Sequence, residues 1–177
     1  IPEVEAVTRA AMLWQPLIRE GNQLLQCAGM EADADFFKVF PEYRLVEGSL
    51  EGFFGKDDVL ISESLARKLS KDGGSLIGNT IHVDESDRTI KGIFADFDGA
   101  FFMPYDIITH ISGTWAAEQE RNFGSIGNYT TWFRVREDAD PDDVRAKVSA
   151  LLHKNYDPIW SAEKVDSWKA YRMDEAF

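Results

Sequence analysis

The sequence contains only one cysteine, Cys27, in 177 residues. A single cysteine excludes an intrachain disulfide, and with it the small disulfide-stapled folds that are common among secreted proteins. Cys27 lies in an apolar run of the sequence. We therefore expect it to be a small residue of the hydrophobic core, with no redox role.

Long hydrophobic runs are also missing. No stretch approaches the roughly 18 apolar residues that a transmembrane helix requires. No basic segment is followed by an apolar one, as it would be in a signal peptide. The chain starts at Ile1 and not at an initiator methionine. We therefore expect a processed or excised fragment, whose targeting segments would lie outside it.

Positive charge is scarce. The 19 Lys and Arg residues are outnumbered by 31 Asp and Glu residues, for a formal net charge of -12, and the densest charge cluster, at 137–143, is acidic. Such a chain repels a phosphate backbone or an anionic membrane surface, so we expect no nucleic acid partner. Apolar residues make up 44% and aromatic residues 12% of the chain, which is enough for a folded core.

The motifs of nucleotide and serine chemistry are absent. Residues 73–80 have the spacing of a P-loop, but Asn79 stands where the lysine that reaches the phosphates must be. We interpret this segment as a turn that needs glycine. No Gly-x-Ser-x-Gly elbow is present, and helix capping explains Ser62 and Ser64.

Metal-binding patterns are incomplete. The three histidines, at positions 82, 110 and 153, lack zinc-site spacing. Asp96 and Asp98 resemble part of a calcium loop that lacks its third acidic position and its distal glutamate. We interpret the acidic clusters as solvated surface, with a weak cation site as the alternative. The sequence thus predicts no catalytic, cofactor-binding or metal-binding residue; an acid/base hydrolase that uses Asp96 and Asp98 is the enzyme alternative.

The pattern along the chain predicts short strands interrupted by a few helices. Alternation of apolar and polar residues marks strands, and clusters of Gly, Asn and Asp mark turns. Strands are expected at 8–20 paired with 22–30, at 59–61, at 80–83 paired with 88–94, at 129–136 and at 165–173. Segment 106–111 is ambiguous between helix and strand, and 114–127 is predicted to be a linker or mobile loop.

Capping residues mark the helices. Ser62 is the expected N-cap of a helix that runs to about residue 70, and Asp35 and Pro41 bound a short helical turn. Asp140 caps a further helix. One face of that helix is formed by Val144, Val148, Leu151 and Leu152. Together with the strands before and after it, this helix would form a β-α-β unit of a ferredoxin-like layer.

The middle of the chain resembles a known family. Residues 57–69, Asp-Asp-Val-Leu-Ile-Ser-Glu-Ser-Leu-Ala-Arg-Lys-Leu, resemble the strand–helix segment of the MacB-like periplasmic core domain. The Ile-Gly turn and hairpin that follow it in the family are similar to 77–81 and 88–94 here. Segments 1–7, 32–37 and 45–48 are similar to the start of that domain. The degenerate run 70–79, and 114–127, which has no recognised counterpart, leave the subfamily and cargo open.

The resemblance implies an α+β fold with two lobes. A ferredoxin-like β-α-β lobe close to the membrane, porter-like in kind, would be built from both chain ends, residues 1–40 and 127–177. A mixed α/β distal lobe, residues 41–126, would be inserted between them.

The resemblance further implies an extracytoplasmic (periplasmic) domain of an ABC transporter permease of the MacB/FtsX type, and not an enzyme. Tethered to the bacterial inner membrane, it would relay ATP-driven conformational change to an extracytoplasmic substrate or partner. Its partners would be the transmembrane helices of its own permease chain, a cytoplasmic ABC ATPase and, where one exists, a periplasmic or outer-membrane protein. No cofactor is implied. The alternative is a stand-alone secreted binding or adaptor domain.

Phe53 and Phe54, between Gly52 and Gly55, are the candidate partner contact. Neighbours in an extended segment point to opposite sides, so one ring would anchor the loop while the other stays at least partly exposed. An exposed aromatic residue is a typical hot spot of an interface. The alternative is that both rings are buried through an irregular turn, which the flanking glycines permit.

Overall fold

The computed structural model describes residues 1–20, 23–51, 55–70, 73–96, 104–111, 129–156, 161–166 and 170–172. The strands in these parts are β1 (Val4–Leu13), β2 (Leu17–Glu20), β3 (Gln23–Gln26), β4 (Gly29–Ala32), β5 (Leu45–Gly48), β6 (Asp58–Ser62), β7 (Thr80–Val83), β8 (Ser86–Phe94), β9 (Ile107–His110) and β10 (Thr130–Val135). The helices are α1 (Phe36–Val39), α2 (Glu63–Leu69), α4 (Pro141–Tyr156) and α5 (Ala162–Asp166). The expected α+β fold is confirmed.

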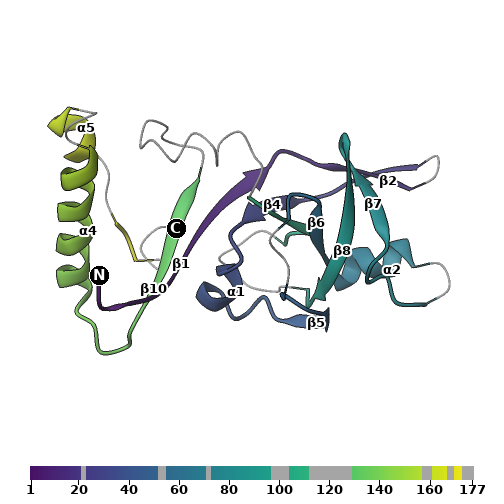
Figure 1. Cartoon of the computed structure of the whole chain (residues 1–177), viewed down its shortest axis with the longest axis horizontal. Helices are drawn as coiled ribbons and strands as arrows, with labels where there is room; N and C mark the ends of the chain where they lie inside the picture. Colours follow the sequence, from purple (N-terminus) through teal and green to yellow (C-terminus); the bar gives the residue numbers. More distant parts are fainter. Residues whose placement is uncertain are drawn as a thin grey trace.

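One mixed sheet contains the ten described strands. Nine of them follow the order β10-β1-β4-β9-β6-β8-β7-β2-β3, and β5 pairs with β8 beside this path. The β4–β9 and β6–β8 pairs are parallel, whereas β10 joins β1 in antiparallel fashion. Figure 1 shows β2 at one end of an elongated molecule and α4 at the other, with β10 further in than α4. The sheet therefore runs from the β2 end as far as β10, and α4 lies beyond its last strand.

The longest strand, β1, links the two ends of this sheet. Its residues from Val4 to Ala10 pair with β10, and its residues from Ala10 to Leu13 pair with β4. Ala10 thus has a strand neighbour on both sides. Because β10 comes from the far end of the sequence, this ladder holds the beginning and the end of the described chain side by side (Figure 1).

Two hydrophobic cores cover the two faces of the central sheet. In β6, Val59 and Ile61 join one core and Leu60 joins the other, because neighbouring side chains alternate across a strand. α2 closes the first core with Leu65, and α1 closes the second with Phe36. The buried strand predicted here is confirmed, and its burial on both faces explains why it is continuously apolar.

The elements that local signals predicted are present. Ser62 Oγ accepts a hydrogen bond from the backbone N–H of Leu65 at 3.1 Å, so α2 begins with the expected cap. β7 and β8 form the expected hairpin, with a two-residue turn of Asp84 and Glu85. The ambiguous segment 106–111 forms strand β9. Cys27 is buried, as expected.

The two runs predicted to pair near the start of the chain do pair, but each is divided into two strands. β2 and β3 form the expected hairpin, and the outer parts of the two runs pair as β1 and β4. The first run breaks at Gln15, whose φ is 46°, and at Pro16, which has no N–H for a ladder. The backbone therefore turns between β1 and β2.

The strand predicted at 165–173 is wrong at its start. Residues Ala162–Asp166 form helix α5, in which the backbone N–H of Val165 donates to the carbonyl of Ser161 at 3.1 Å. Val165 is buried, and Asp166 Oδ1 lies 3.1 Å from Nε2 of His153 on α4. Packing against α4 therefore decides the local structure of this segment. None of the described helices is long and apolar enough to cross a membrane.

Candidate functional site

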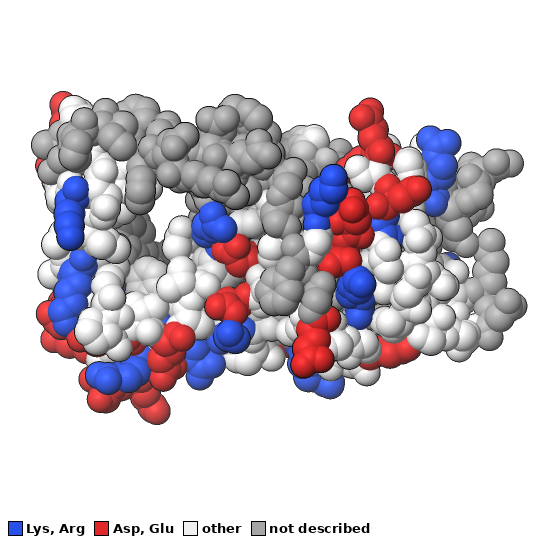
Figure 2. All heavy atoms as spheres, in the orientation of Figure 1, with Lys and Arg blue, Asp and Glu red and all other residues white. Residues whose placement is uncertain are grey.

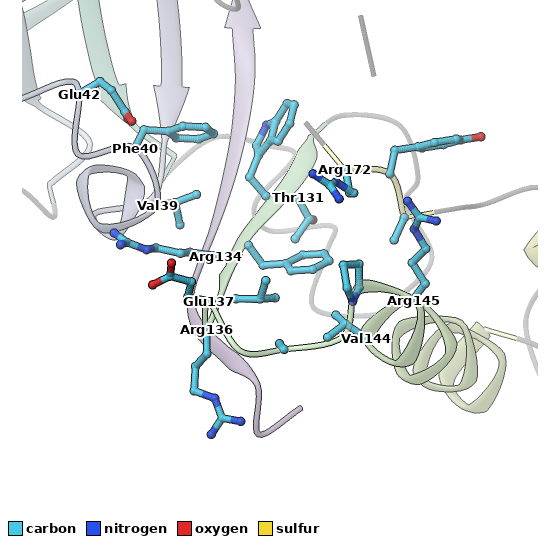
Figure 3. A pocket seen from close by; sticks show the side chains of 17 residues that line it. Val39, Phe40, Glu42, Thr131, Arg134, Arg136, Glu137, Val144, Arg145 and Arg172 are labelled. Atoms are coloured by element: carbon cyan, nitrogen blue, oxygen red, sulfur yellow. The ribbon is translucent and has the colours of Figure 1, made fainter. Parts of the chain in front are cut away.

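An open groove of about 530 Å³ lies beside β10, the last strand on its end of the sheet. Figure 3 shows it between this strand and the first turn of α4, with the end of α1 nearby. Residues 131–137 form a continuous wall, and residues 170–172 line the groove as well. The strand edge, and not only its side chains, is thus part of the groove.

The groove has an apolar floor. Trp132 packs edge-on against Phe40 of the neighbouring core, with ring centroids 5.7 Å apart. Val144 at the start of α4 is 3% exposed, but Leu151, further along the helix, is 52% exposed. Of the apolar face that the sequence predicted for this helix, Val144 is buried, Val148 and Leu152 are partly buried, and Leu151 is exposed.

Three of the four arginines that line the groove, Arg134, Arg136 and Arg145, have carboxylate partners. Arg134 lies 3.5 Å from Glu5, and Arg136 lies 3.1 Å from Asp138. Figure 3 shows these two arginines extending away from the side of β10 that faces α4. Figure 2 shows Asp and Glu side chains gathered around the start of α4, at the lower left of the molecule. The groove is therefore no simple anion site.

A lysine attaches α4 to the first residues of the chain. Lys147 Nζ lies 2.6 Å from Glu3 Oε1 and 2.6 Å from Asp143 Oδ2. The backbone N–H of Arg136 donates to the carbonyl of Glu3 at 2.9 Å. The hydrogen bond from Lys147 lowers the pKa of Glu3, and the bonds to Asp143 and Glu3 raise the pKa of Lys147. Both groups are therefore charged at neutral pH, and the contact is an ion pair.

A second ion pair fixes β1 to the turn after β4. Arg9 donates to both carboxylate oxygens of Asp33, at 2.9 Å each, and the backbone N–H of Arg9 adds a bond of 2.9 Å. His110 is half-buried, and burial lowers its pKa although Asp33 raises it. The neutral imidazole is therefore favoured. The Arg9–Asp33 pair ties β1 to the end of β4.

Burial raises the pKa of Glu31 in β4, against the opposing attraction of Arg88. Burial disfavours the charged carboxylate of Glu31 in the folded chain more than in the unfolded chain. The folded state therefore loses stability as the pH rises and Glu31 loses its proton. We expect Glu31→Gln to raise the melting temperature at pH 7, and the gain to shrink below pH 4.5, where Glu31 binds a proton. Thermal unfolding at both pH values, with Glu51→Gln as the exposed control, measures this. A lower melting temperature at pH 7 would contradict it.

The structure does not bring the sequence candidates together into a chemical site. Phe53 and Phe54 lie outside the described residues, as does Asp98, so the contact predicted for the two rings stays a prediction. Asp96 accepts hydrogen bonds from the backbone N–H and hydroxyl of Ser64 and pairs with Arg67 at 2.8 Å. Burial alone would raise the pKa of Asp96, but the hydrogen bonds from Ser64 and Arg67 lower it. Because it accepts the N–H of Ser64, Asp96 is a capping carboxylate of α2.

The other polar motifs have structural roles. His82 pairs with Asp87 at 2.8 Å within the β7–β8 hairpin, far from His153 on α4. Gly73 and Gly78 have φ values of 69° and 84°, so the P-loop-like run contains turns that need glycine, as predicted. In the parts of the chain that the structure describes, no group of three or more His, Cys, Asp or Glu residues is placed to hold a metal ion.

Sequence reasoning missed the groove beside β10. Its walls come from segments more than 90 residues apart, near residues 40 and 131–137, which no local pattern connects. The sequence did contain one signal of this groove. Trp132 and Phe133 are adjacent large aromatics in a strand, so they lie on opposite faces and cannot both enter the same core.

Comparisons with known proteins agree on one family. The family model of the MacB-like periplasmic core domain matches residues 1–151. A domain of a protein assigned as a permease, from Porphyromonas gingivalis, is 25% identical with a TM-score of 0.75, over 90% of this chain and 68% of that one. No curated protein matches.

Two further solved structures share the fold. The periplasmic region of MacB from Actinobacillus actinomycetemcomitans is 13% identical with a TM-score of 0.64, over 87% of this chain and 68% of that one. The extracellular domain of the ABC-type transporter YknZ from Gram-positive bacteria is 15% identical with a TM-score of 0.64, over 89% and 79%. The family is one of transporter domains and is not a known enzyme family. The chain therefore belongs to the MacB-like periplasmic core domains, the extracytoplasmic domains of MacB/FtsX-type ABC transporter permeases.

Proposed function

We propose that this domain relays ATP-driven conformational change from the membrane part of its permease to an extracytoplasmic substrate or partner. The observation that carries the proposal is the double pairing of β1, which binds β10 along its first part and β4 along its last. A strand whose two ends are hydrogen-bonded to different neighbours passes a displacement of one neighbour on to the other, as long as it moves as a rigid element. β1 is therefore suited to transmit a movement of the chain ends along the sheet.

The end unit that would receive this movement consists of β10, α4 and the first half of β1. The Lys147–Glu3 ion pair and the Arg136–Glu3 backbone bond hold α4 to the beginning of β1. In a permease, the transmembrane helices of the same chain would pull on this unit, and the cytoplasmic ATPase would act through them. We place it in the membrane-proximal lobe, residues 1–40 and 127–177, on the extracytoplasmic side of the inner membrane.

The remainder of the sheet would carry the movement into the distal lobe, residues 41–126. Two ladders cross from the first segment into this lobe, β4 with β9 and β2 with β7. The lobes would thus be coupled by backbone hydrogen bonds and not by a flexible linker. Phe53 and Phe54 belong to this lobe by sequence, and a partner contact there, with a periplasmic or outer-membrane protein, is part of the proposal.

The coupling can be tested in the intact permease with its ATPase. Glu3→Gln removes the anionic partner that α4 has on β1. Asp143→Asn is the matched control, because it removes the partner of Lys147 within α4 and leaves Glu3 in place. Hydrogen exchange of the β2 and β7 segments, with and without ATP and vanadate, reports the movement without requiring the cargo. We expect the nucleotide-dependent change to persist in Asp143→Asn and to fall severalfold in Glu3→Gln, with ATP hydrolysis retained.

An unchanged response in Glu3→Gln would show that α4 does not pass its movement to β1. Equal losses in both variants, with lower melting temperatures, would assign the ion pair to stability alone. A stand-alone secreted adaptor is the second candidate function. It would require a parent gene without apolar runs of about 20 residues on either side of this domain.

A further inference from the structure

A second cavity, of about 390 Å³, lies where β1 ends and the chain turns into β2. It is lined by residues 12–15 on one side, residues 26–29 on the other, and Tyr105. We call it the Trp14 pocket. Its volume lies within the range of small-molecule sites, roughly 300–1,000 Å³. It is distinct from the groove beside β10, with which it shares no lining residue.

The floor of the Trp14 pocket is fixed by backbone hydrogen bonds. The N–H of Cys27 donates to the carbonyl of Pro16 at 2.9 Å. Ala28 donates to the carboxylate of Asp106 at 2.9 Å and accepts from the N–H of Asp106 at 2.7 Å. A Cβ on Gly29 would lie 2.6 Å from Pro16 Cγ, so the chain approaches this closely only with glycine. One wall is therefore preformed.

The rim of the pocket is exposed and apolar. The Trp14 side chain is 82% exposed and that of Met12 is 54% exposed, the largest exposures among the large hydrophobic residues near this site. The left-handed backbone of Gln15, with φ 46°, makes the turn that presents them. A ligand that covers these two large apolar side chains is stabilised by roughly 25 cal/mol per Å² of apolar surface removed from water.

The chemistry of the lining is uncharged. None of the nine lining residues is Asp, Glu, Lys, Arg or His, in a chain with 28% charged residues. The polar groups are two side-chain amides, Gln15 and Gln26, the Tyr105 hydroxyl and the Cys27 thiol. Burial raises the pKa of Cys27 to about 11 and raises that of Tyr105, so both are neutral at pH 7. An anion would meet a net charge of -12 and the Asp106 carboxylate beside Ala28, and no lining residue is a cation, although Lys68 lies near enough to act on the Cys27 thiol.

We propose that the Trp14 pocket binds a neutral, apolar small molecule, which packs on Trp14 and Met12 and reaches the amides beside Cys27. A protein partner is the less favoured occupant. The exposed Leu17 and Leu24 of the β2–β3 hairpin share their face with the polar residues Arg19 and Gln26, which pair with them across the strands. A stable interface needs about 800 Å² on each partner. The binding site is independent of the relay role and can be tested on the isolated chain.

The test uses two probes with one scaffold, neutral N-phenyl-1-naphthylamine and anionic 1-anilinonaphthalene-8-sulfonate, followed by fluorescence. We expect saturable binding of the neutral probe and about tenfold weaker binding of the anion. Trp14→Ala should weaken the binding of the neutral probe about three- to tenfold. Leu24→Ala, at an exposed apolar residue outside the pocket, is the control and should change nothing.

A further variant locates the probe. Gln26→Lys, at an exposed position, should reverse the preference towards the anionic probe. The absence of saturable binding, equal losses in Trp14→Ala and Leu24→Ala, or an unchanged preference in Gln26→Lys would overturn the proposal. So would a dimer in gel filtration that Trp14→Ala dissociates, since the occupant would then be a second copy. None of these results bears on the hydrogen-exchange response of the permease.

Discussion

Replacement of Phe36 by alanine should lower the free energy of unfolding by about 3–5 kcal/mol. Phe36 is 1% exposed, and its ring contacts three others. The centroid distances are 5.5 Å to Phe37, 4.9 Å to Phe40 and 5.2 Å to Tyr43. The variant loses the burial of the ring, leaves a cavity that rigid neighbours cannot fill, and removes the aromatic contacts.

The matched control is Phe37→Ala on the same helix. The Phe37 side chain packs against this core from outside and is only partly buried, so its truncation should cost clearly less. Urea unfolding followed by circular dichroism gives both values. Since small domains have a total stability of about 5–15 kcal/mol, the Phe36 variant should be measured at low temperature. Equal losses at the two positions would show that the core is not centred on Phe36.

The parts of the fold that the sequence predicted are those in which neighbours along the chain decide the structure. The cap at Ser62, the turn at Asp84 and the alternation in β10 depend on residues a few positions apart. Segment 106–111 stayed ambiguous because a short segment with three apolar residues suits either a strand or a helix. Its strand form is imposed by β4 and β6, which lie on both sides of it in the sheet.

The parts that escaped sequence reasoning depend on contacts between distant segments. The floor of the Trp14 pocket joins Ala28 to Asp106, 78 positions away. The edge of β10 forms a groove only because β1 pairs with it across the whole chain. The helix at Ala162–Asp166 replaced a predicted strand because Val165 packs inward and Asp166 reaches His153. No local pattern of apolar residues contains this information.

The candidate site shows the same difference between features that local sequence determines and features that distant contacts determine. Sequence reasoning predicted that Ser62 caps a helix, and Ser62 Oγ accepts the backbone N–H of Leu65 as predicted. Asp96, which the sequence offered only as part of an enzyme alternative, accepts the backbone N–H of Ser64 in the same turn. The resemblance supplied the family, which the comparisons confirm. The aromatic pair between two glycines pointed to Phe53 and Phe54. The described surface points instead to Trp14, next to the left-handed Gln15, which no composition rule foresees.

Gly48→Ala should be far more damaging than Gly73→Ala, although both glycines have left-handed backbones, with φ values of 86° and 69°. At Gly73 an added Cβ meets nothing within 4 Å, so the cost is that of the conformation, about 1–2 kcal/mol. At Gly48 the Cβ would lie 2.3 Å from the carbonyl oxygen of Lys91 and 2.7 Å from Gly92 Cα. Both contacts are with backbone, which no change of rotamer relieves.

The strand β5 must therefore move away from β8 in the Gly48 variant. The bond from the N–H of Ser49 to the carbonyl of Lys91, 3.2 Å long, would be lost together with the pairing of Gly48 with Gly92. We expect a further loss of about 1–3 kcal/mol beyond the Gly73 control, as in other overpacked sites. Urea unfolding of the two variants and the parent chain measures the difference, and hydrogen exchange of residues 45–49 locates it. Both variants share the cost of a left-handed backbone at a residue with a Cβ. Equal losses of stability would therefore mean that β5 moves away from β8 without further cost and contributes little to the stability of the sheet.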